Sequence, residues 1–508
     1  MSLNPSPAIA ALLSFLFPGV GQIYAGDLRK GVLWALPMLL FILAIIWLLL
    51  GPKLAIANLV FSPQTRVAIL VLNVAFFLYH VASMVDAYSL AKTERYRGFS
   101  RTSSTAPVVL AALVAATMVL HGVPEVIGLD VNNAANILGV GHPDVLPSFT
   151  PRPTNAPSTT PLATPTPDVT AVPSGSVEPT PSGPVGPSPT PRACPQVDFA
   201  GWAPADDGRL NILLSGSDSR SDEGAGTNSI RTDSMMLLSI EIATCKAALF
   251  SFPRNMNCAV GYPDWFHIAL ENGQDYPDCL NYLWRSAAAN PNNYPGSEDI
   301  GSECQAQFDC ERGWRALTGA IQIFANQPID GVIAVNLKGF VALVEALPGH
   351  GVWIDVPEAL HDDVYHDSQQ RPIVVDFQPG CQFLDGEEAL AFARSRHQDS
   401  DYQRARRQQI FLQQVRKQLD PLALLGSMDS LLLAAQENLF MSFAQSDFQY
   451  LAQIASHVDA DRLYRYDFAP NQLKDFNSMD DMAAQIHDIF SEPEPAPPNK
   501  NEPPCPPR

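Results

Sequence analysis

The chain has 508 residues, enough for about two to four domains of ordinary size, so a single small module is excluded. It carries 32 Lys and Arg residues against 52 Asp and Glu residues, and the net charge of −20 argues against coating nucleic acid, which requires a basic face. Hydrophobic residues make up 46% of a chain that also contains 45 prolines, so strongly apolar and proline-rich segments must occupy different regions.

Residues 1–124 are predicted to form a membrane region of three to four helices. Gly31–Leu50 has no charged residue over about twenty positions, and a helix of that length spans the hydrocarbon core of a bilayer. Val67–Val85 and Thr105–Val123 are similar stretches, and buried helices of soluble domains seldom remain uncharged for so long. Core helices of a soluble domain are the alternative.

A shorter apolar segment, Ala8–Tyr24, is interrupted by Pro18, Gly19 and Gly21. It is compatible with a span, a re-entrant segment or an interfacial helix, and these alternatives remain open. Residues 18–31, PGVGQIYAGDLRKG, loosely resemble the glycine-rich turn of small two-helix membrane domains, and an ordinary glycine-rich turn between helices is the preferred interpretation. No basic region precedes the segment, so a cleaved signal peptide is not expected.

Basic residues that flank the apolar segments predict the orientation of the chain. Six lie on one side and two on the other, so the side with six is assigned to the cytoplasm. The six are Arg29, Lys30, Lys92, Arg95, Arg97 and Arg101, and the two are Lys53 and Arg66. The C-terminal domain is then extracytoplasmic, in a multi-pass protein of the cell membrane. All eight cysteines follow the last apolar segment, as expected for disulfides in an oxidising compartment, and proximity favours a Cys304–Cys310 pair.

Two segments have compositions that cannot bury a core. Residues 125–204 are predicted to be an extracytoplasmic linker, because proline is the commonest residue from Thr150 to Cys194 and most of the others are Thr, Ser and Gly. Such a chain favours an extended, polyproline-like conformation. Residues 491–508 form a second proline-rich segment, which is predicted to be a disordered tail.

Residues 205–490 have the composition of a globular domain. Short apolar runs bounded by turn residues predict buried strands at Arg209–Gly216, Asp233–Ile242 and Cys245–Phe252. Runs near Val335 and Ile354 continue this pattern of strands that are buried on both faces.

Helical patterns alternate with these strands. They are Arg312–Asn326, Lys338–Ala346, Asp385–Arg394 and Tyr402–Leu419. Asp385 and Glu388 form a predicted capping box. Glu271–Arg312 is expected to be a loop-rich insertion. The alternation predicts an α/β/α sandwich with a buried mixed sheet.

Polar residues collect where the predicted strands end. Asp218 and Arg220 follow the first strand, Asp233 opens the second, and Arg254 and Asn255 follow the third. Ligands bind at such strand ends in open α/β sheets. On their own, the two aspartates fit turn and strand-start positions better than metal binding.

A cluster of arginines lies between Ala393 and Gln409, in a domain that is otherwise acidic. It consists of Arg394, Arg396, Arg404, Arg406 and Arg407. Arg404 and Arg407 are three positions apart and share a helix face, with Gln408 beside them, so an oligophosphate ligand is the sharper hypothesis. The alternative is a solvated helix face whose charges meet neighbouring carboxylates, and it is preferred for Arg406.

Five linked motifs resemble the LytR-CpsA-Psr family of cell-wall glycopolymer transferases. In chain order they read NILLSGSDSR, RTDSMMLLSI, LFSFPRN, PGCQFLDGEEALAFARSRH and DYQRARRQQIFL, within about residues 210–419. The resemblance implies a membrane-anchored phosphotransferase with Mg²⁺ as its cofactor. It would move a phosphoglycan from a polyprenyl-pyrophosphate carrier to a peptidoglycan hydroxyl, so its expected partners are the lipid-linked glycan, the wall acceptor and membrane lipid, without nucleic acid.

The resemblance also implies roles for individual residues. Asp218 and Asp233 match magnesium-binding aspartates. Arg254, Arg394 and Arg396 are expected to be catalytic. The expected substrate-binding residues are Arg220, Arg404, Arg407 and Gln408. These roles suit phosphoryl transfer, which depends mainly on positioning and on stabilising charge.

Three departures from the family pattern raise alternative functions. Asn255 stands where the family commonly has Asp, and an amide cannot accept a proton as a base does. His267-Ile268-Ala269 replaces the family's Lys-Ile-Asn, and the cysteine-bearing insertion is the third departure. The alternatives are a catalytically weak binder or tether of lipid-linked glycan, and a polyprenyl-pyrophosphate phosphatase.

Overall fold

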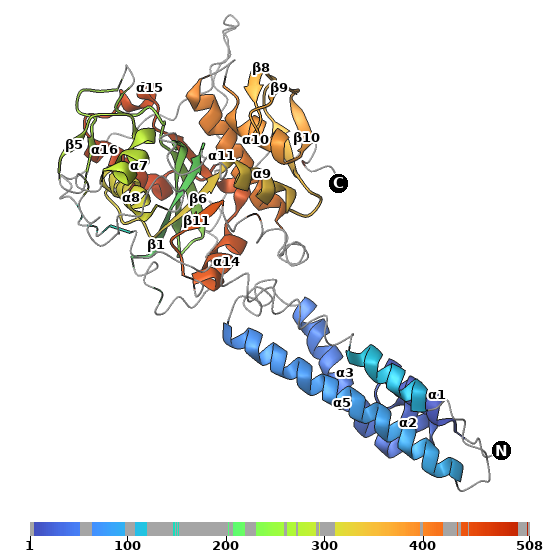
Figure 1. Ribbon diagram of the computed structural model, residues 1–508. Coiled ribbons are helices and arrows are strands. Elements are labelled where there is room, and N and C mark those ends of the chain that lie inside the picture. The colour runs from blue at the N-terminus through green and yellow to red at the C-terminus, as the bar shows by residue number, and fades with distance from the viewer. Residues whose placement is uncertain are drawn as a thin grey trace, which may run out of the picture. The chain divides into compact units, whose positions relative to one another are not determined.

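The structure is a computed structural model in which two compact units can be described (Figure 1). The described residues are 5–50, 63–96, 107–118, 146–147, 149, 151, 202, 207–218, 230–258, 262–270, 273–290, 294, 310–396, 400–419, 434, 438–444, 447–495 and 505. The N-terminal unit comprises residues 1–139, 421–432 and 445–456, and the catalytic unit comprises the rest. Most of the predicted linker lies outside the described residues, although Leu146 packs against the core of the catalytic unit and Trp202 is buried.

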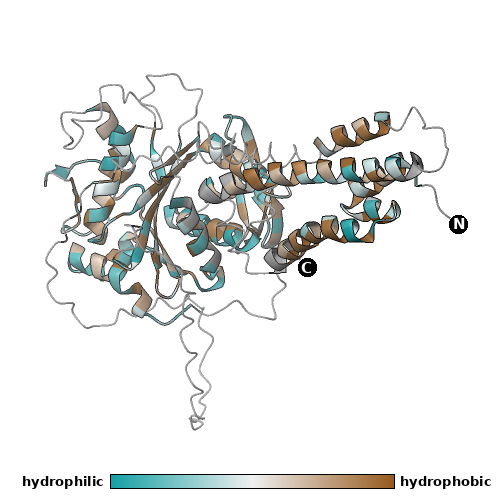
Figure 2. Ribbon diagram, turned by 90° about the horizontal axis from the view of Figure 1, so that it is seen from below, coloured by the Kyte–Doolittle hydropathy of each residue, from teal (hydrophilic) through white to brown (hydrophobic). Residues whose placement is uncertain are grey.

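The N-terminal unit is helical at the places predicted from its apolar segments. Its helices are α1 (Pro7–Leu16), α2 (Val20–Tyr24), α3 (Leu28–Leu50), α5 (Pro63–Tyr96) and a further helix, Pro107–Met118. Figure 2 shows hydrophobic residues along most of their length. Within the described residues, one segment, Val71–Thr93 of α5, is long and apolar enough to cross a membrane. α14 (Phe448–His457) lies largely in this unit by its contacts.

The interrupted segment Ala8–Tyr24 forms two helices and not one. Gly19 breaks it in the left-handed region with φ of 101°, and a Cβ there would lie 2.2 Å from the carbonyl oxygen of Gly31. The buried Gln22 accepts from Ser14 Oγ at 3.0 Å and donates to the carbonyl of Ser83 at 2.9 Å. These polar contacts fix the turn against α1 and α5.

The centre of the catalytic unit is a six-stranded mixed sheet in the order β11-β6-β1-β2-β3-β12. β1 pairs antiparallel with β2 and parallel with β6, β2 pairs antiparallel with β3, β3 pairs parallel with β12, and β6 pairs antiparallel with β11. Their bounds are β1 Arg209–Ser217, β2 Thr232–Glu241, β3 Lys246–Ser251, β6 Gly331–Asn336, β11 Leu439–Met441 and β12 Tyr464–Asp467. The first three strands and β6 confirm the predicted buried runs.

Helices cover both faces of this sheet, as the sequence predicted (Figure 1). One face carries α7 (Leu280–Ala289), α8 (Glu311–Ala325) and α16 (Met479–Asp488), which share a hydrophobic core with the sheet. The other face carries α9 (Leu337–Glu345), α10 (Gly386–Arg394) and α11 (Asp401–Gln418). The capping box is confirmed, because Asp385 accepts from the amide of Glu388 while the Glu388 side chain accepts from that of Asp385.

Two predictions about the secondary structure were wrong. The run near Ile354 forms β7 (Val352–Val356), which pairs with β10 (Gly380–Leu384) in a separate two-stranded sheet. Its burial alternates, with Asp355 exposed, because only one face of this small sheet is covered. The expected loop-rich insertion contains α7, whose apolar residues Leu280, Leu283 and Ala287 recur at helical spacing and are buried.

The remaining elements of the catalytic unit are short. They are β4 (Ile268–Ala269), β5 (Asp275–Tyr276), β8 (Leu360–His366), β9 (Pro372–Phe377), α15 (Pro470–Leu473), and the 3₁₀ helices η5 (Ala460–Arg462) and η6 (Ile489–Ser491). β4 pairs with β5 and β8 with β9, each antiparallel.

The C-terminal tail, predicted to be disordered, is held to the catalytic unit in its described part. Glu494 lies 3.6 Å from Lys246 and also pairs with Arg462. Cys505 forms a disulfide with Cys381 of β10. A second disulfide joins Cys258 and Cys279. Cys245 is disulfide-bonded, and so is Cys310. Cys304, the predicted partner of Cys310, lies outside the described residues.

Candidate active site

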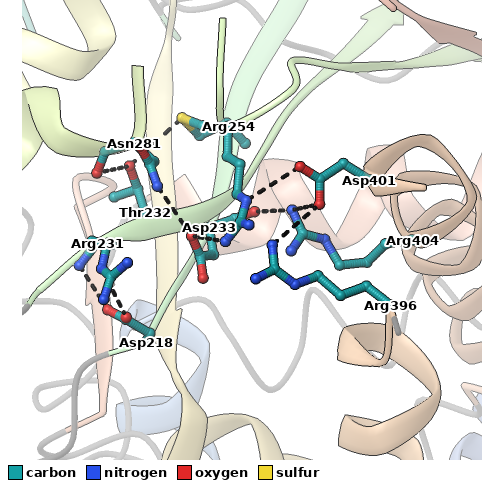
Figure 3. Close-up of polar contacts among 10 residues, drawn as sticks. Asp218, Arg231, Thr232, Asp233, Arg254, Asn281, Arg396, Asp401 and Arg404 are labelled. Carbon is teal, nitrogen blue, oxygen red and sulfur yellow. Dashed lines mark hydrogen bonds and ion pairs between the residues drawn. The ribbon is translucent and has the colours of Figure 1, made fainter. Parts of the chain in front are cut away.

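Three predicted site residues meet at one edge of the central sheet (Figure 3). Asp218 follows the end of β1, Asp233 lies at the start of β2, and Arg254 follows the end of β3. Because β2 runs antiparallel to both neighbours, the start of β2 lies beside the ends of β1 and β3. The strand pairing therefore brings together residues that are up to 36 positions apart, Asp218 and Arg254.

Arg254 joins two carboxylates at the centre of this edge. Its Nη1 donates to Asp233 Oδ1 at 3.1 Å, and its Nε donates to Asp401 Oδ2 at 3.3 Å. Asn281 of α7 also donates to Asp233 Oδ1, at 3.3 Å. Arg254 is largely buried, with a side-chain exposure of 16%, so these contacts are weakly screened by water.

Asp401 gathers two further arginines around the same edge. Its Oδ1 lies 3.5 Å from Arg404 Nη2 and 3.7 Å from Arg396 Nη1. Arg404 also donates to the backbone carbonyl of Asp233 at 3.1 Å, which ties α11 to β2. Ser400 caps α11 by accepting from the amide of Gln403, so the helix starts with Asp401 facing the cluster.

Asp218 lies at the other end of the cluster and is held by Arg231. The backbone amide of Arg231 donates to Asp218 Oδ1 at 2.7 Å, and Arg231 Nε lies 3.5 Å from Oδ2. Burial raises the pKa of Asp218 to about 6, and the negative charge of Asp233 adds to this effect. The amide and guanidinium of Arg231 and the charge of Arg394 lower it in part.

The pKa of Asp233 is shifted in the opposite direction, below its ordinary value. Burial alone would raise its pKa, but the charges of Arg254 and Arg404 and the hydrogen bonds from Arg254 and Asn281 hold it below the ordinary value. Burial likewise opposes the charge on Arg254, and Asp233 and Asp401 raise the pKa of its guanidinium overall. Asp233 and Arg254 are therefore both charged at neutral pH.

The described cluster has more positive than negative groups. Five guanidinium groups interact with three carboxylates, in a protein whose net charge is −20. They are Arg231, Arg254, Arg394, Arg396 and Arg404, with Asp218, Asp233 and Asp401. Nη1 of Arg394 is buried without a hydrogen-bond partner among the described residues, and its guanidinium carbon lies 5.8 Å from the ring centroid of Tyr365. This edge is suited to an anion with several oxygens.

Arg407 and Gln408 contact the end of α10, whereas the sequence predicted that both bind substrate. Nε of Arg407 donates to the carbonyl of Phe392 at 2.8 Å, and its Nη2 donates to that of Ser395. Nε2 of Gln408 donates to the carbonyl of Ala393 at 3.1 Å. These bonds hold the backbone on both sides of Arg394. Arg220, the other predicted substrate-binding residue, lies outside the described residues.

Two residues of the cluster, Asp401 and Asn281, were not among the predicted site residues. Asp401 is the shared partner of Arg254, Arg396 and Arg404. Its position as the acidic first residue of an arginine-rich helix could have indicated this role from the sequence. Asn281 reaches Asp233 from α7, which lies in the expected loop-rich insertion, and no local pattern indicated it.

Asp218 and Asp233 suit a cation that takes most of its ligands from substrate and water and only a few from the protein. Among the residues that can be described, no group of three or more His, Cys, Asp or Glu side chains could hold a metal. Asp218 and Asp233 lie close enough for the charge of Asp233 to raise the pKa of Asp218, which a bound cation would relieve. Mg²⁺ commonly binds through one or two carboxylates and completes its shell with phosphate oxygens and water, so the two aspartates fit it.

Several proteins are similar to this chain in sequence. TagT of Bacillus subtilis, a polyisoprenyl-teichoic acid–peptidoglycan teichoic acid transferase, is 22% identical over 51% of this chain and 69% of its own length. TagU of Halalkalibacterium halodurans, which has the same descriptive name, is 28% identical over 41% of this chain and 53% of its own length. A Staphylococcus aureus protein without an assigned function is 29% identical over 27% of this chain. The chain spans only 33% of that relative's length.

Among solved structures, the crystal structure of B. subtilis TagV aligns with 56% of this chain and 98% of its own. The TM-score is 0.38 and the sequence identity is 17%. The LytR_cpsA_psr family model matches residues 188–484, more than half of the chain and most of the catalytic unit that contains the cluster. The match includes every residue of the cluster, from Asp218 to Arg404. The chain belongs to the LytR_cpsA_psr family.

Proposed function

We propose that this protein transfers a phosphoglycan from a polyprenyl-pyrophosphate carrier to a hydroxyl group of peptidoglycan. The main support for the proposal is that guanidinium groups outnumber carboxylates in the cluster at the sheet edge, although the protein as a whole is acidic. A pyrophosphate is the kind of ligand that this excess would balance, because its oxygens accept several charge-assisted hydrogen bonds at once. TagT and TagU are named as transferases that join teichoic acid to peptidoglycan, and this similarity supports the same reaction class.

Each side chain then has a distinct task. Arg254, Arg394 and Arg396 would stabilise the charge that develops on the transferred and leaving phosphates, and Arg404 and Arg220 would bind the donor. Arg407 and Gln408 would act by positioning the end of α10 and hence Arg394. Asp218 and Asp233 would hold Mg²⁺, which when bound would neutralise phosphate oxygens.

The reaction can be measured with the full chain in detergent. Synthetic polyprenyl-pyrophosphate-linked glycan and peptidoglycan are supplied, and polyprenyl phosphate and the glycan–peptidoglycan product are quantified. We expect both products with Mg²⁺ and neither with EDTA, and Asp218→Ala is expected to lose Mg²⁺-dependent turnover without loss of fold. Full activity in EDTA would contradict the role of the two aspartates.

Two other results would identify the alternative functions. Polyprenyl phosphate without a peptidoglycan product indicates a phosphatase, since water would then be the acceptor. Retention of the lipid-linked glycan without release of polyprenyl phosphate indicates a binder or tether. Either result would reject the transfer reaction.

We further propose that the N-terminal unit anchors the protein as a multi-pass membrane domain with the catalytic unit outside the cytoplasm. The apolar segment Val71–Thr93 and the asymmetry of flanking basic residues support this orientation. A protease added to intact cells should release a soluble fragment that begins within residues 125–204. Cleavage there only in inverted vesicles would reverse the orientation, and mass spectrometry of the fragment provides the readout.

A further inference from the structure

The last strand of the central sheet ends beside the candidate active site. β12 runs parallel to β3, with Asp467 in register with Ser251, so Asp467 lies at the same sheet edge as Arg254. Residues in register on neighbouring strands project to the same face. Gln409 of α11 donates to Ser251 Oγ at 2.7 Å, so this face, and Asp467 with it, is covered by α11.

Two tyrosines, Tyr402 and Tyr262, lie close enough to Asp467 and Asp401 for both charges to affect them. Tyr402 follows Asp401 in the first turn of α11, and Tyr262 lies in the chain after β3. Burial raises the pKa of Tyr402 to about 12, and the charges of Asp467 and Asp401 add to this. Burial also raises the pKa of Tyr262, with additions from Tyr402, Asp467 and Asp401. These four side chains therefore interact with one another, and Asp401 connects them to Arg254.

Polar atoms of this group lack partners. Asp467 Oδ1 and the Tyr262 hydroxyl are both buried, and neither forms a hydrogen bond with any described residue. Buried polar atoms are nearly always satisfied, and leaving one unpaired is unfavourable, so the two atoms indicate a ligand that supplies hydroxyl groups. Asp467 itself is only partly buried, which leaves it accessible to such a ligand.

The protonation behaviour of Asp467 fits a base. Burial raises its pKa to about 7. Among the described residues, its charge raises the pKa values of three tyrosines, Tyr262, Tyr402 and Tyr466, none of which is a cation. A base works best when its pKa lies near the working pH, and partial burial brings the pKa of Asp467 to that range.

We propose that Asp467 is the catalytic base that takes the proton of the acceptor hydroxyl, and that Tyr402 and Tyr262 hold the sugar that bears it. The inference rests on the proposed transfer reaction. In that reaction the acceptor oxygen bonds to the glycan-linked phosphorus, and the bridging bond to the lipid phosphate breaks. Its electron pair leaves with polyprenyl phosphate, and the hydroxyl proton moves to Asp467.

Other candidates for the base are already engaged or unsuited. The oxygens of Asp401 are shared among three arginines. Asp233 accepts from Arg254 and Asn281, and together with Asp218 it is proposed to hold the cation. Asn255 is an amide, so it cannot serve as a base. Asp467 therefore supplies, from a neighbouring strand, a carboxylate that the sequence lacks at position 255.

The test compares Asp467→Asn with the unmutated full chain in the transfer assay. We expect turnover to fall about a hundredfold, the size of a typical general-base contribution, while the KM for the lipid-linked donor is unchanged. The unmutated rate should rise with pH through about 7, and the variant should lose this dependence. Asn255→Asp should not raise the rate, because the base is already present. Asp376→Asn, an exposed carboxylate on β9, is the matched control and should leave turnover unchanged.

The free energy of unfolding of Asp467→Asn distinguishes a catalytic role of Asp467 from a structural one. The folded-state pKa of Asp467 is raised above its ordinary value, so any stabilisation by its protonated form is lost as the pH rises through about 7. At pH 8 the neutral Asp467→Asn variant should thus be at least as stable as the unmutated chain. Tyr402→Phe, which keeps the ring, should weaken binding of the acceptor and leave donor binding intact.

Each outcome decides between the two proposals. If the unmutated protein transfers glycan and Asp467→Asn transfers it equally fast, the assignment of Asp467 is wrong while the transfer function stands. The same holds if Asn255→Asp accelerates the reaction and Asp467→Asn does not slow it. If the unmutated protein releases no polyprenyl phosphate with any acceptor, the transfer reaction is rejected and the role of Asp467 is rejected with it.

Discussion

Arg254→Lys is expected to lower glycan transfer by about a hundredfold or more. Arg254 uses two different nitrogens to contact Asp233 and Asp401, at 3.1 and 3.3 Å. Lysine keeps the charge but has a single ammonium group, so it cannot reproduce this planar two-sided contact. Losing one positioned donor in a water-excluded site costs on the order of 3 kcal/mol of transition-state stabilisation, which corresponds to about two orders of magnitude in rate.

The transfer assay with saturating donor and acceptor provides the measurement. Arg371→Lys is the matched control, because Arg371 also pairs with an aspartate, Asp367, but is 64% exposed. Exposed ion pairs contribute little, so the control should retain full turnover. Equal rates for Arg254→Lys and the unmutated chain would show that Arg254 has no specific role in the reaction.

Trp314→Ala is expected to lower the free energy of unfolding of the catalytic unit by about 3–5 kcal/mol. Trp314 of α8 is completely buried. Its ring stacks on Phe440 of β11 with centroids 5.4 Å apart, and it lies 5.7 Å from the ring of Trp284 in α7. The truncation removes contacts to two elements, β11 and α7, and leaves a cavity that the surrounding rings cannot fill.

Hydrogen exchange of the β1 and β6 amides in the full chain reports this change, since the slowest amides exchange through global opening. Trp353→Ala is the control. Trp353 is only partly buried, on β7 of the small sheet, where it contacts Phe383 edge to face at 5.4 Å. Its loss should change the exchange of β1 and β6 much less. A similar loss in both variants, or less than about 1 kcal/mol for Trp314→Ala, would contradict this account of the core.

The elements flanking the site could be predicted because their signals are local. The strands β1, β2 and β3 and the helices α8 to α11 lie within a few residues of their predicted bounds. The capping box at Asp385 depends only on residues three positions apart, and it forms as predicted. The apolar segments of the N-terminal unit are likewise helical.

Three features of the structure depend on contacts that no local sequence pattern specifies. β7 was predicted as a strand, but with both faces buried, because a short apolar run does not show which strand it pairs with or how many of its faces are covered. α7 was hidden among cysteines and asparagines, although its buried face has helical spacing. The C-terminal tail has the composition of a disordered chain, yet a disulfide between residues 124 positions apart ties Cys505 to β10.

By itself, the sequence determined the buried strands, most helices, the family resemblance and the residue types at the strand ends, because each depends on neighbouring positions in the chain. The tertiary structure decided which of these side chains share the site. It placed Asp401 among three arginines, directed Arg407 to the backbone of α10, and brought Asp467 beside α11. These contacts join residues far apart in the chain, and they form only when strand order and helix packing are settled together.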